Sequence, residues 1–296
     1  PFTASLIAGY FDLALYNDTA SIDLARRILN APNIEPASHG YAHPLVWREG
    51  TVALSIPRYR MNPRKEIVES AKMIREKILP GGPPVGVFLW TGDCRPWEKD
   101  LAVLEESGML GLNGAGGRYD RVFPSYAHLF PLTRQVGKRR QVYSPMYNED
   151  DYTDSWTGPF YGYRDSIETF ERTAAPRRIK PVDVYVHYYS AERYASLEAL
   201  RKVLAWVRSQ PLTPIFAGRY VRMVKGFFEL RVSRAGPRRF RFEGGAPLQT
   251  VRFDGEKGWP DLAASRGVIG FKRELGSLYV LLDGSAAREL VFAARA

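Results

Sequence analysis

Short apolar runs alternate with amphipathic segments from the start of the chain to about residue 225. Residues 85–90 are almost entirely apolar, which is typical of a strand buried on both faces of a parallel sheet. Amphipathic segments with one apolar stripe lie between such runs and predict helices. This repeated strand-then-helix order predicts an α/β fold with a parallel, barrel-like sheet, and places chemistry in the loops that follow the strands.

The boundaries of the expected elements come from capping and breaking residues. Asp18 or Thr19 can cap a helix that ends before Pro32, and Asn62 followed by Pro63 can begin another. The remaining expected helices are residues 97–106, 164–172 and 196–209, and the expected strands are residues 1–9, around Ile34, 85–90, 109–112, 141–147, 182–188 and 212–216.

The pattern changes beyond Lys225. Short, largely alternating segments at residues 228–232, 239–242, 250–253 and 278–281 are separated by glycine-rich turns. They predict a small β-rich module, most simply half of a sandwich. We therefore expect a domain at residues 1–225 and an accessory module at residues 226–296, which covers a barrel edge or, alternatively, binds sugar.

Composition excludes several classes of protein. With 296 residues, 45% of them apolar, the chain can form one barrel and a small module. The net charge of +10 favours polyanions, but the basic residues are scattered and no nucleic-acid motif is present, so we expect no nucleic-acid partner. Cys94 is the single cysteine, which excludes an internal disulfide, and no apolar run is long enough to span a membrane.

Two histidines with HxxxH spacing are the first candidate site residues. His39 and His43 could present both imidazoles to one divalent metal, although an open catalytic site needs a third protein ligand. Pro44 disfavours a regular helix at His43, so we expect the pair on a turn-like loop. The alternative is a pair of capping or core histidines.

A third histidine, His187, ends the apolar run that we expect to be a buried strand. Histidine is suited to proton transfer because its ordinary pKa lies near neutrality. The alternative is a core histidine that bonds to the backbone. His128 has no partner motif, and we expect it at the surface.

Polar and aromatic residues follow other expected strands. Asp93 and Asn113 come just after apolar runs, where each could face a substrate or form a turn. Residues 151–160 combine carboxylates with rings, including Asp154 and Trp156. This segment could orient a sugar by stacking and hydrogen bonding, or it could be a solvated loop anchored by a buried tryptophan.

Together these stretches resemble carbohydrate esterase family 4, the NodB-like metal-dependent polysaccharide deacetylases. The similar stretches are residues 37–44, 89–94, 112–114, 152–162 and 183–193, in family order. Within the family, they are most similar to the deacetylase regions that modify the Pel exopolysaccharide. The resemblance implies a distorted (β/α)7 barrel that removes N-acetyl groups from an amino-sugar polymer.

The resemblance also implies roles for individual residues. His39 and His43 would hold a divalent metal, most often zinc, and His187 would be the general acid toward the leaving amine. Asp93 and Asp154 would assist catalysis, although the usual Arg-x-Pro-Tyr pattern is absent near Asp93. The residues expected on the substrate side are Trp156, Trp90, Asn113 and Tyr188.

Two features of the sequence depart from the family pattern, one residue and one motif. Gly40 stands where the family usually has a serine or threonine that would brace the loop, which could weaken metal binding. The first motif, which supplies the catalytic aspartate and the third metal ligand, should precede Pro1. Asp12 is a poor substitute because the strand before it resembles the second strand of the barrel.

The expected function is de-N-acetylation of an exopolysaccharide of GalNAc or GlcNAc type during polymer export and biofilm production. We expect a periplasmic protein whose signal peptide precedes this chain, and the export machinery for the polymer as its protein partner. A catalytically inactive relative that binds glycan or a synthesis partner is the alternative. A weaker option is a glycoside hydrolase that uses Asp93 and Asp154 as its paired carboxylates.

Overall fold

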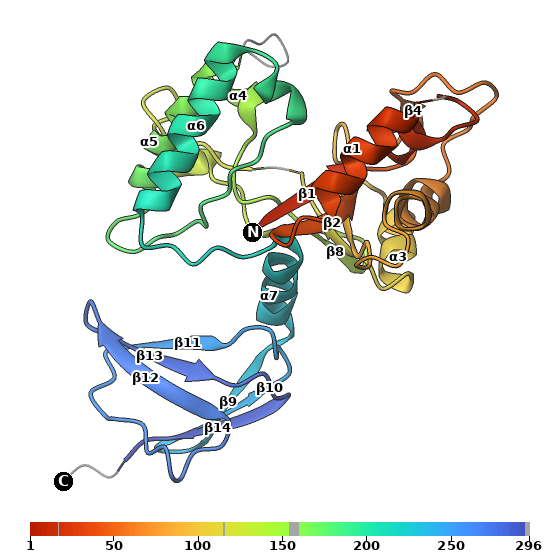
Figure 1. Cartoon of the computed structure of the whole chain (residues 1–296). Helices are drawn as coiled ribbons and strands as arrows, with labels where there is room; N and C mark the ends of the chain where they lie inside the picture. The colour runs from red at the N-terminus through yellow and green to blue at the C-terminus, as the bar shows by residue number, and fades with distance from the viewer. Residues whose placement is uncertain (17, 115, 154–159, 294–296) are drawn as a thin grey trace. The chain divides into compact units, whose positions relative to one another are not determined.

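The computed structural model describes residues 1–16, 18–114, 116–153 and 160–293 (Figure 1). The chain divides into two compact units, Pro1–Gly218 and Arg219–Ala296. The division falls inside the helix α7 (Ala217–Glu229), whereas the sequence places the boundary after Lys225.

A four-stranded parallel sheet lies in the first unit. Its strands are β1 (Phe2–Leu6), β2 (Ile34–Ser38), β5 (Val87–Leu89) and β6 (Leu110–Leu112), in the order β1-β2-β5-β6. All four strands were predicted. Their apolar side chains pack with those of the connecting helices into one core, which includes Leu29, Ile67, Phe88 and Leu101.

The helices predicted in this unit are confirmed, with small shifts of their ends. Asp18 caps the first of them, since its side chain accepts the N–H of Ser21 at 3.1 Å. The helix predicted from Asn62 is a continuous run with wide π turns at both ends, a feature often found beside functional sites. The bounds are η1 Ala8–Phe11, α1 Thr19–Leu29, η2 Lys65–Glu69, α2 Ser70–Met73, η3 Ile74–Ile78, α3 Glu98–Glu106, η4 Tyr126–His128, α4 Glu149–Tyr152, η5 Tyr161–Asp165, α5 Ser166–Arg172, η6 Tyr188–Ala191 and α6 Tyr194–Ser209.

Three predicted strands are wrong. The segment at residues 141–147 contributes only the end of β8 (Arg139–Val142), which pairs antiparallel with β7 (Thr133–Val136). Residues 182–187 are extended but pair with no strand among the described residues, and neither do residues 212–216. Another short pair, β3 (Pro44–Val46) with β4 (Thr51–Val52), follows the histidine loop.

The apolar residues of the 182–187 segment are buried without strand pairing. Val182, Val184 and Val186 pack against a second core that includes Met146, Tyr163, Phe170 and Val203. Phe170 of α5 stacks on Trp206 of α6 at 5.5 Å, and Figure 1 shows these helices side by side. The described parallel strands do not close on themselves, so the (β/α)7 barrel stays a prediction.

The second unit contains three of the predicted short strands, as β10, β11 and β13, and two that the sequence analysis missed, β12 and β14. The segment predicted at residues 228–232 is only partly a strand, because Phe228 and Glu229 end the helix α7, which was not predicted, and β9 begins at Arg231. They form two antiparallel three-stranded sheets, ordered β14-β10-β9 and β11-β13-β12. Phe242, Leu278, Val280 and Leu290 form the buried core between them. The bounds are β9 Arg231–Gly236, β10 Arg239–Glu243, β11 Thr250–Asp254, β12 Val268–Glu274, β13 Ser277–Leu282 and β14 Ala287–Val291.

Within the described residues, no helix of either unit has the length and apolar character needed to cross a membrane.

Candidate active site

The histidine loop begins where β2 ends, at the carboxyl edge of the parallel sheet. His39 directly follows this strand, and Gly40 and His43 have φ angles of 85° and 55°, so the loop turns without forming a helix. The ring centroids of His39 and His43 are 5.0 Å apart. The predicted turn-like loop is therefore confirmed, and the turn rather than helical spacing brings the two imidazoles together.

Hydrogen bonding determines which nitrogen of His39 carries the proton. Nδ1 of His39 lies 2.9 Å from the backbone oxygen of Leu89, which can only accept, so Nδ1 donates and Nε2 keeps its lone pair. Metal-binding histidines are commonly oriented by such a bond to a backbone carbonyl. Nδ1 of His43 is buried and has no hydrogen-bond partner within the described residues.

Both rings of the pair are neutral at physiological pH. Burial, followed by the charges of His43 and His187, lowers the pKa of His39 to about 3. Burial and the charge of His187 lower the pKa of His43 to about 4. Neutral imidazole is the form that binds a metal ion, so protons do not compete for these nitrogens near neutrality.

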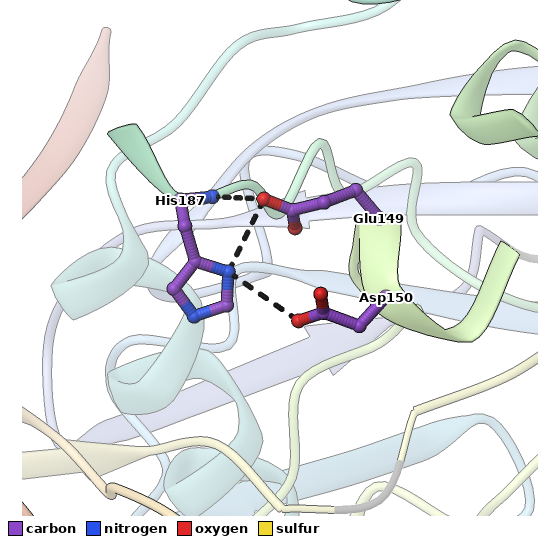
Figure 2. Close-up of side chains that lie close together, drawn as sticks. All are labelled: Glu149, Asp150 and His187. Atoms are coloured by element: carbon purple, nitrogen blue, oxygen red, sulfur yellow. Dashed lines mark hydrogen bonds and ion pairs between the residues drawn. The ribbon is translucent and has the colours of Figure 1, made fainter. Parts of the chain in front are cut away.

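His187 is held by two acidic side chains from α4. Its backbone N–H donates to Oε1 of Glu149 at 2.6 Å, and its ring Nδ1 lies 3.2 Å from the same oxygen. Nδ1 is also 3.7 Å from Oδ2 of Asp150. Figure 2 shows that the second ring nitrogen points away from both carboxylates. A carboxylate that holds a histidine by Nδ1 orients the ring for proton transfer at Nε2.

The two carboxylates themselves are buried. Glu149 is fully buried, and its Oε2 has no hydrogen-bond partner within the described residues. Burial, followed by the charge of Glu149, raises the pKa of Asp150 to about 6, against the smaller lowering effects of His187 and Tyr189. Ligand atoms of Glu149, Asp150 and His187 lie within 4.8 Å of one another, a spacing that could also hold a cation.

A chain of contacts connects His187 to the histidine loop. Next to Leu89, the backbone oxygen of Trp90 accepts Nδ2–H of Asn113 at 3.1 Å. The same amide group lies 3.0 Å from the hydroxyl of Tyr185, whose ring is 5.8 Å from that of His187. The charge of His187 contributes to lowering the pKa of both His39 and His43, so the three imidazoles lie within electrostatic reach of one another.

The predicted substrate residues have different surroundings. Trp90 is 1% exposed and packs edge-on against Trp47 and Phe88, and Asn113 is 2% exposed. The structure places both in the core rather than at a substrate surface, since the indole of Trp90 packs among other rings and the amide of Asn113 donates to the backbone oxygen of Trp90. Tyr188 is 59% exposed and is accessible to a polymer.

The candidate aspartates also require revision. Oδ1 of Asp93 accepts the backbone N–H groups of Trp47 and Arg95, which is the turn-forming alternative rather than a catalytic position. Oδ2 of Asp12 accepts the hydroxyl of Tyr41, which agrees with its rejection as a substitute ligand. Asp154 and Trp156 lie outside the described residues, and His128 is exposed as predicted.

The sequence analysis missed three acidic residues of the site. Glu149 and Asp150 follow Asn148, a capping residue whose side chain accepts the N–H of Asp150, so the run of capping and acidic residues was an available signal. Glu66 is fully buried and accepts the N–H groups of Tyr41 and Ala42. No local pattern distinguishes it from the exposed acidic residues of its helix.

Comparison with known proteins adds no family. A scan against protein-family models gives no match, and a search of curated proteins finds no relative of this chain.

Proposed function

We propose that this chain carries the site of a metal-dependent de-N-acetylase that acts on an N-acetylhexosamine-containing exopolysaccharide. The observation that carries the proposal is the grouping of three histidines with different surroundings. Within the described residues, two of them have no acidic partner and offer metal-binding nitrogens, while the third is held by carboxylates. This division matches the two tasks of the reaction, which are to activate the acetamide and to protonate the leaving amine.

The metal would be held by His39 and His43. The donor set fits a divalent ion, since His39 is oriented by a backbone carbonyl and His43 has a buried ring nitrogen that no described residue satisfies. A catalytic zinc site usually has three protein ligands, so the proposal requires one more ligand besides this pair. Bound zinc would polarise the acetamide carbonyl and lower the pKa of a water molecule.

His187 would act as the general acid. Its Nδ1 is occupied by Glu149, so the opposite ring nitrogen is directed away from the carboxylates. The oxygen of water adds to the acetamide carbon and one water proton passes to solvent. The C–N bond then breaks as the amine nitrogen takes a proton from His187, which solvent protonates again. The products are acetate and an amino sugar. In this proposal the polymer is modified in the periplasm during export.

The test is release of acetate from N-acetylated hexosamine oligomers by the full-length protein, together with its metal content. His39→Ala should lose bound metal and activity. His187→Ala should keep the metal but lose at least 100-fold in rate, because general acid catalysis contributes about 10²–10⁴-fold. His128→Ala, an exposed histidine, is the matched control and should remain active.

Undiminished acetate release in both His39→Ala and His187→Ala would reject the mechanism. If the unmodified full-length protein binds the oligomers but releases no acetate, the chain is an inactive relative that binds glycan.

A further inference from the structure

A fully buried carboxylate lies inside the turn that carries His39 and His43. Oε2 of Glu66 accepts the backbone N–H of Tyr41 at 2.7 Å and that of Ala42 at 3.0 Å, and its Oε1 accepts the hydroxyl of Tyr59. Tyr41 and Ala42 lie between the two histidines. Two successive N–H groups of the loop therefore converge on this one carboxylate, at a point of the sequence between the two histidines.

The backbone of the loop is shaped around the carboxylate. Successive backbone N–H groups that converge on an anion form a concave binding site for it. Gly40 has a φ of 85°, and a Cβ atom at this position would lie only 2.8 Å from Oε2 of Glu66. The carboxylate thus takes the space of a side chain at position 40, and the loop keeps a brace although Gly40 has no hydroxyl.

The same helical run contacts the loop a second time. One turn after Glu66, Oγ of Ser70 lies 2.6 Å from Oγ of Ser38, the residue before His39, and also donates to the backbone oxygen of Glu66. Outside the carboxylate, Nζ of Lys65 lies 4.1 Å from the ring centre of Tyr41. The continuous helical run of η2 and α2 therefore contacts the loop at two places, through Ser70 before His39 and through Glu66 between the two histidines.

We propose that Glu66 is a positioning residue that sets the separation and tilt of the His39 and His43 imidazoles for a divalent cation. The inference rests on the proposed function, because it assumes that the pair binds metal. Burying a carboxylate is costly unless it is well hydrogen-bonded, and here the histidine loop supplies the N–H donors. Loss of the carboxylate removes the group around which the two ring positions are organised.

The experiment is a titration of the metal-free full-length protein with Co²⁺, followed by its visible absorption, and competition with Zn²⁺. Glu66→Gln keeps the shape of the side chain but places an amide against the N–H groups of the loop. We expect Co²⁺ affinity to fall 10–100-fold, as for other residues that orient metal ligands, and the absorption band to change. Glu69→Gln removes an exposed carboxylate from the same helical run and should change neither.

Circular dichroism and urea unfolding of the metal-free variants separate positioning from folding. If Glu66→Gln does not fold, Tyr59→Phe decides, since it removes one hydroxyl from the carboxylate and keeps both backbone bonds. It should weaken Co²⁺ binding several-fold and shift the band. If Glu66→Gln folds and its Co²⁺ affinity and absorption band are unchanged, the positioning role of Glu66 is wrong and the proposed function stands. The same result for Tyr59→Phe leads to the same conclusion where Glu66→Gln does not fold. Absence of Co²⁺ binding by the unmodified protein would overturn the proposed function as well.

Discussion

At the scale of single residues, the site depends on two adjacent carboxylates that face one imidazole. Glu149 and Asp150 are both buried, and two neighbouring buried carboxylates cannot both ionise without cost. Burial and the charge of Glu149 raise the pKa of Asp150 to about 6. Asp150 therefore titrates within two pH units of neutrality, next to the histidine that we propose as the acid.

This shift predicts how stability changes with pH. Between about pH 4 and pH 6, the folded state keeps a proton on Asp150 that the unfolded state has released, so the free energy of unfolding falls as pH rises. From pH 4.5 to pH 7.5, we expect the fall in the free energy of unfolding to be about 2 kcal/mol smaller in Asp150→Asn than in the unmodified protein, as measured by urea unfolding. Exposed Glu192→Gln is the control, and equal slopes for Asp150→Asn and the unmodified protein would contradict the assigned pKa.

At the scale of elements, the segment that carries His187 is held by side chains instead of a sheet. The backbone N–H of Tyr185 donates to the hydroxyl of Tyr163 at 3.0 Å, and the hydroxyl of Tyr185 bonds to Asn113. Glu149 accepts the backbone N–H of His187. The position of the proposed acid thus depends on a few buried polar contacts, each of which can be removed separately.

Removing the hydroxyl of Tyr163, which accepts the backbone N–H of Tyr185, should loosen the segment at residues 182–187. Tyr163→Phe leaves a buried N–H unsatisfied, so we expect a loss of about 1–3 kcal/mol in unfolding free energy. Amide hydrogen exchange at Tyr185 should become faster, and acetate release should fall because His187 is displaced. Tyr161→Phe changes a neighbouring exposed tyrosine and serves as the control. Unchanged exchange at Tyr185 would show that other contacts position the segment.

At the scale of the whole molecule, the second unit has its own core. Leu278, Val280 and Leu290 are each fully buried within its two sheets, and every described residue of this core belongs to the second unit. The histidine site lies entirely in the first unit. We therefore expect the stability of the β-rich unit and the metal affinity of the site to respond separately to substitution.

Leu290→Ala tests this separation. Truncating a buried leucine should destabilise the β-rich unit by about 2–5 kcal/mol and leave Co²⁺ affinity unchanged. Trp259 is the one tryptophan in the sequence after residue 218. In a background where the other tryptophans are replaced, the fluorescence of Trp259 therefore reports unfolding of the second unit. Leu281→Ala, at an exposed position of β13, is the control. A parallel fall in Co²⁺ affinity would mean that the β-rich unit supports the site.

The sequence predicted those parts of the fold that depend on neighbouring residues. The strands β1, β5 and β6 follow from largely apolar runs, and the start of α1 follows from the capping side chain of Asp18. The segment at residues 182–187 misled the prediction because its valines are buried against helices, and burial alone produces the same apolar pattern as a central strand. A local pattern indicates that a side chain is buried but does not indicate which element covers it.

The three histidines of the candidate site could be singled out in the sequence, whereas the residues that bond to them could not. His39, His43 and His187 follow strand-like runs, so their types and spacing identified them as candidates. Glu66 and Glu149 bond to residues 25 and 38 positions away, and only packing brings such residues together. The sequence by itself determined which side chains can bind metal or transfer protons. The tertiary structure decided which imidazole nitrogens are left for a metal ion and which carboxylate bonds to His187. Both depend on hydrogen bonds and burial, which arise from contacts between distant segments.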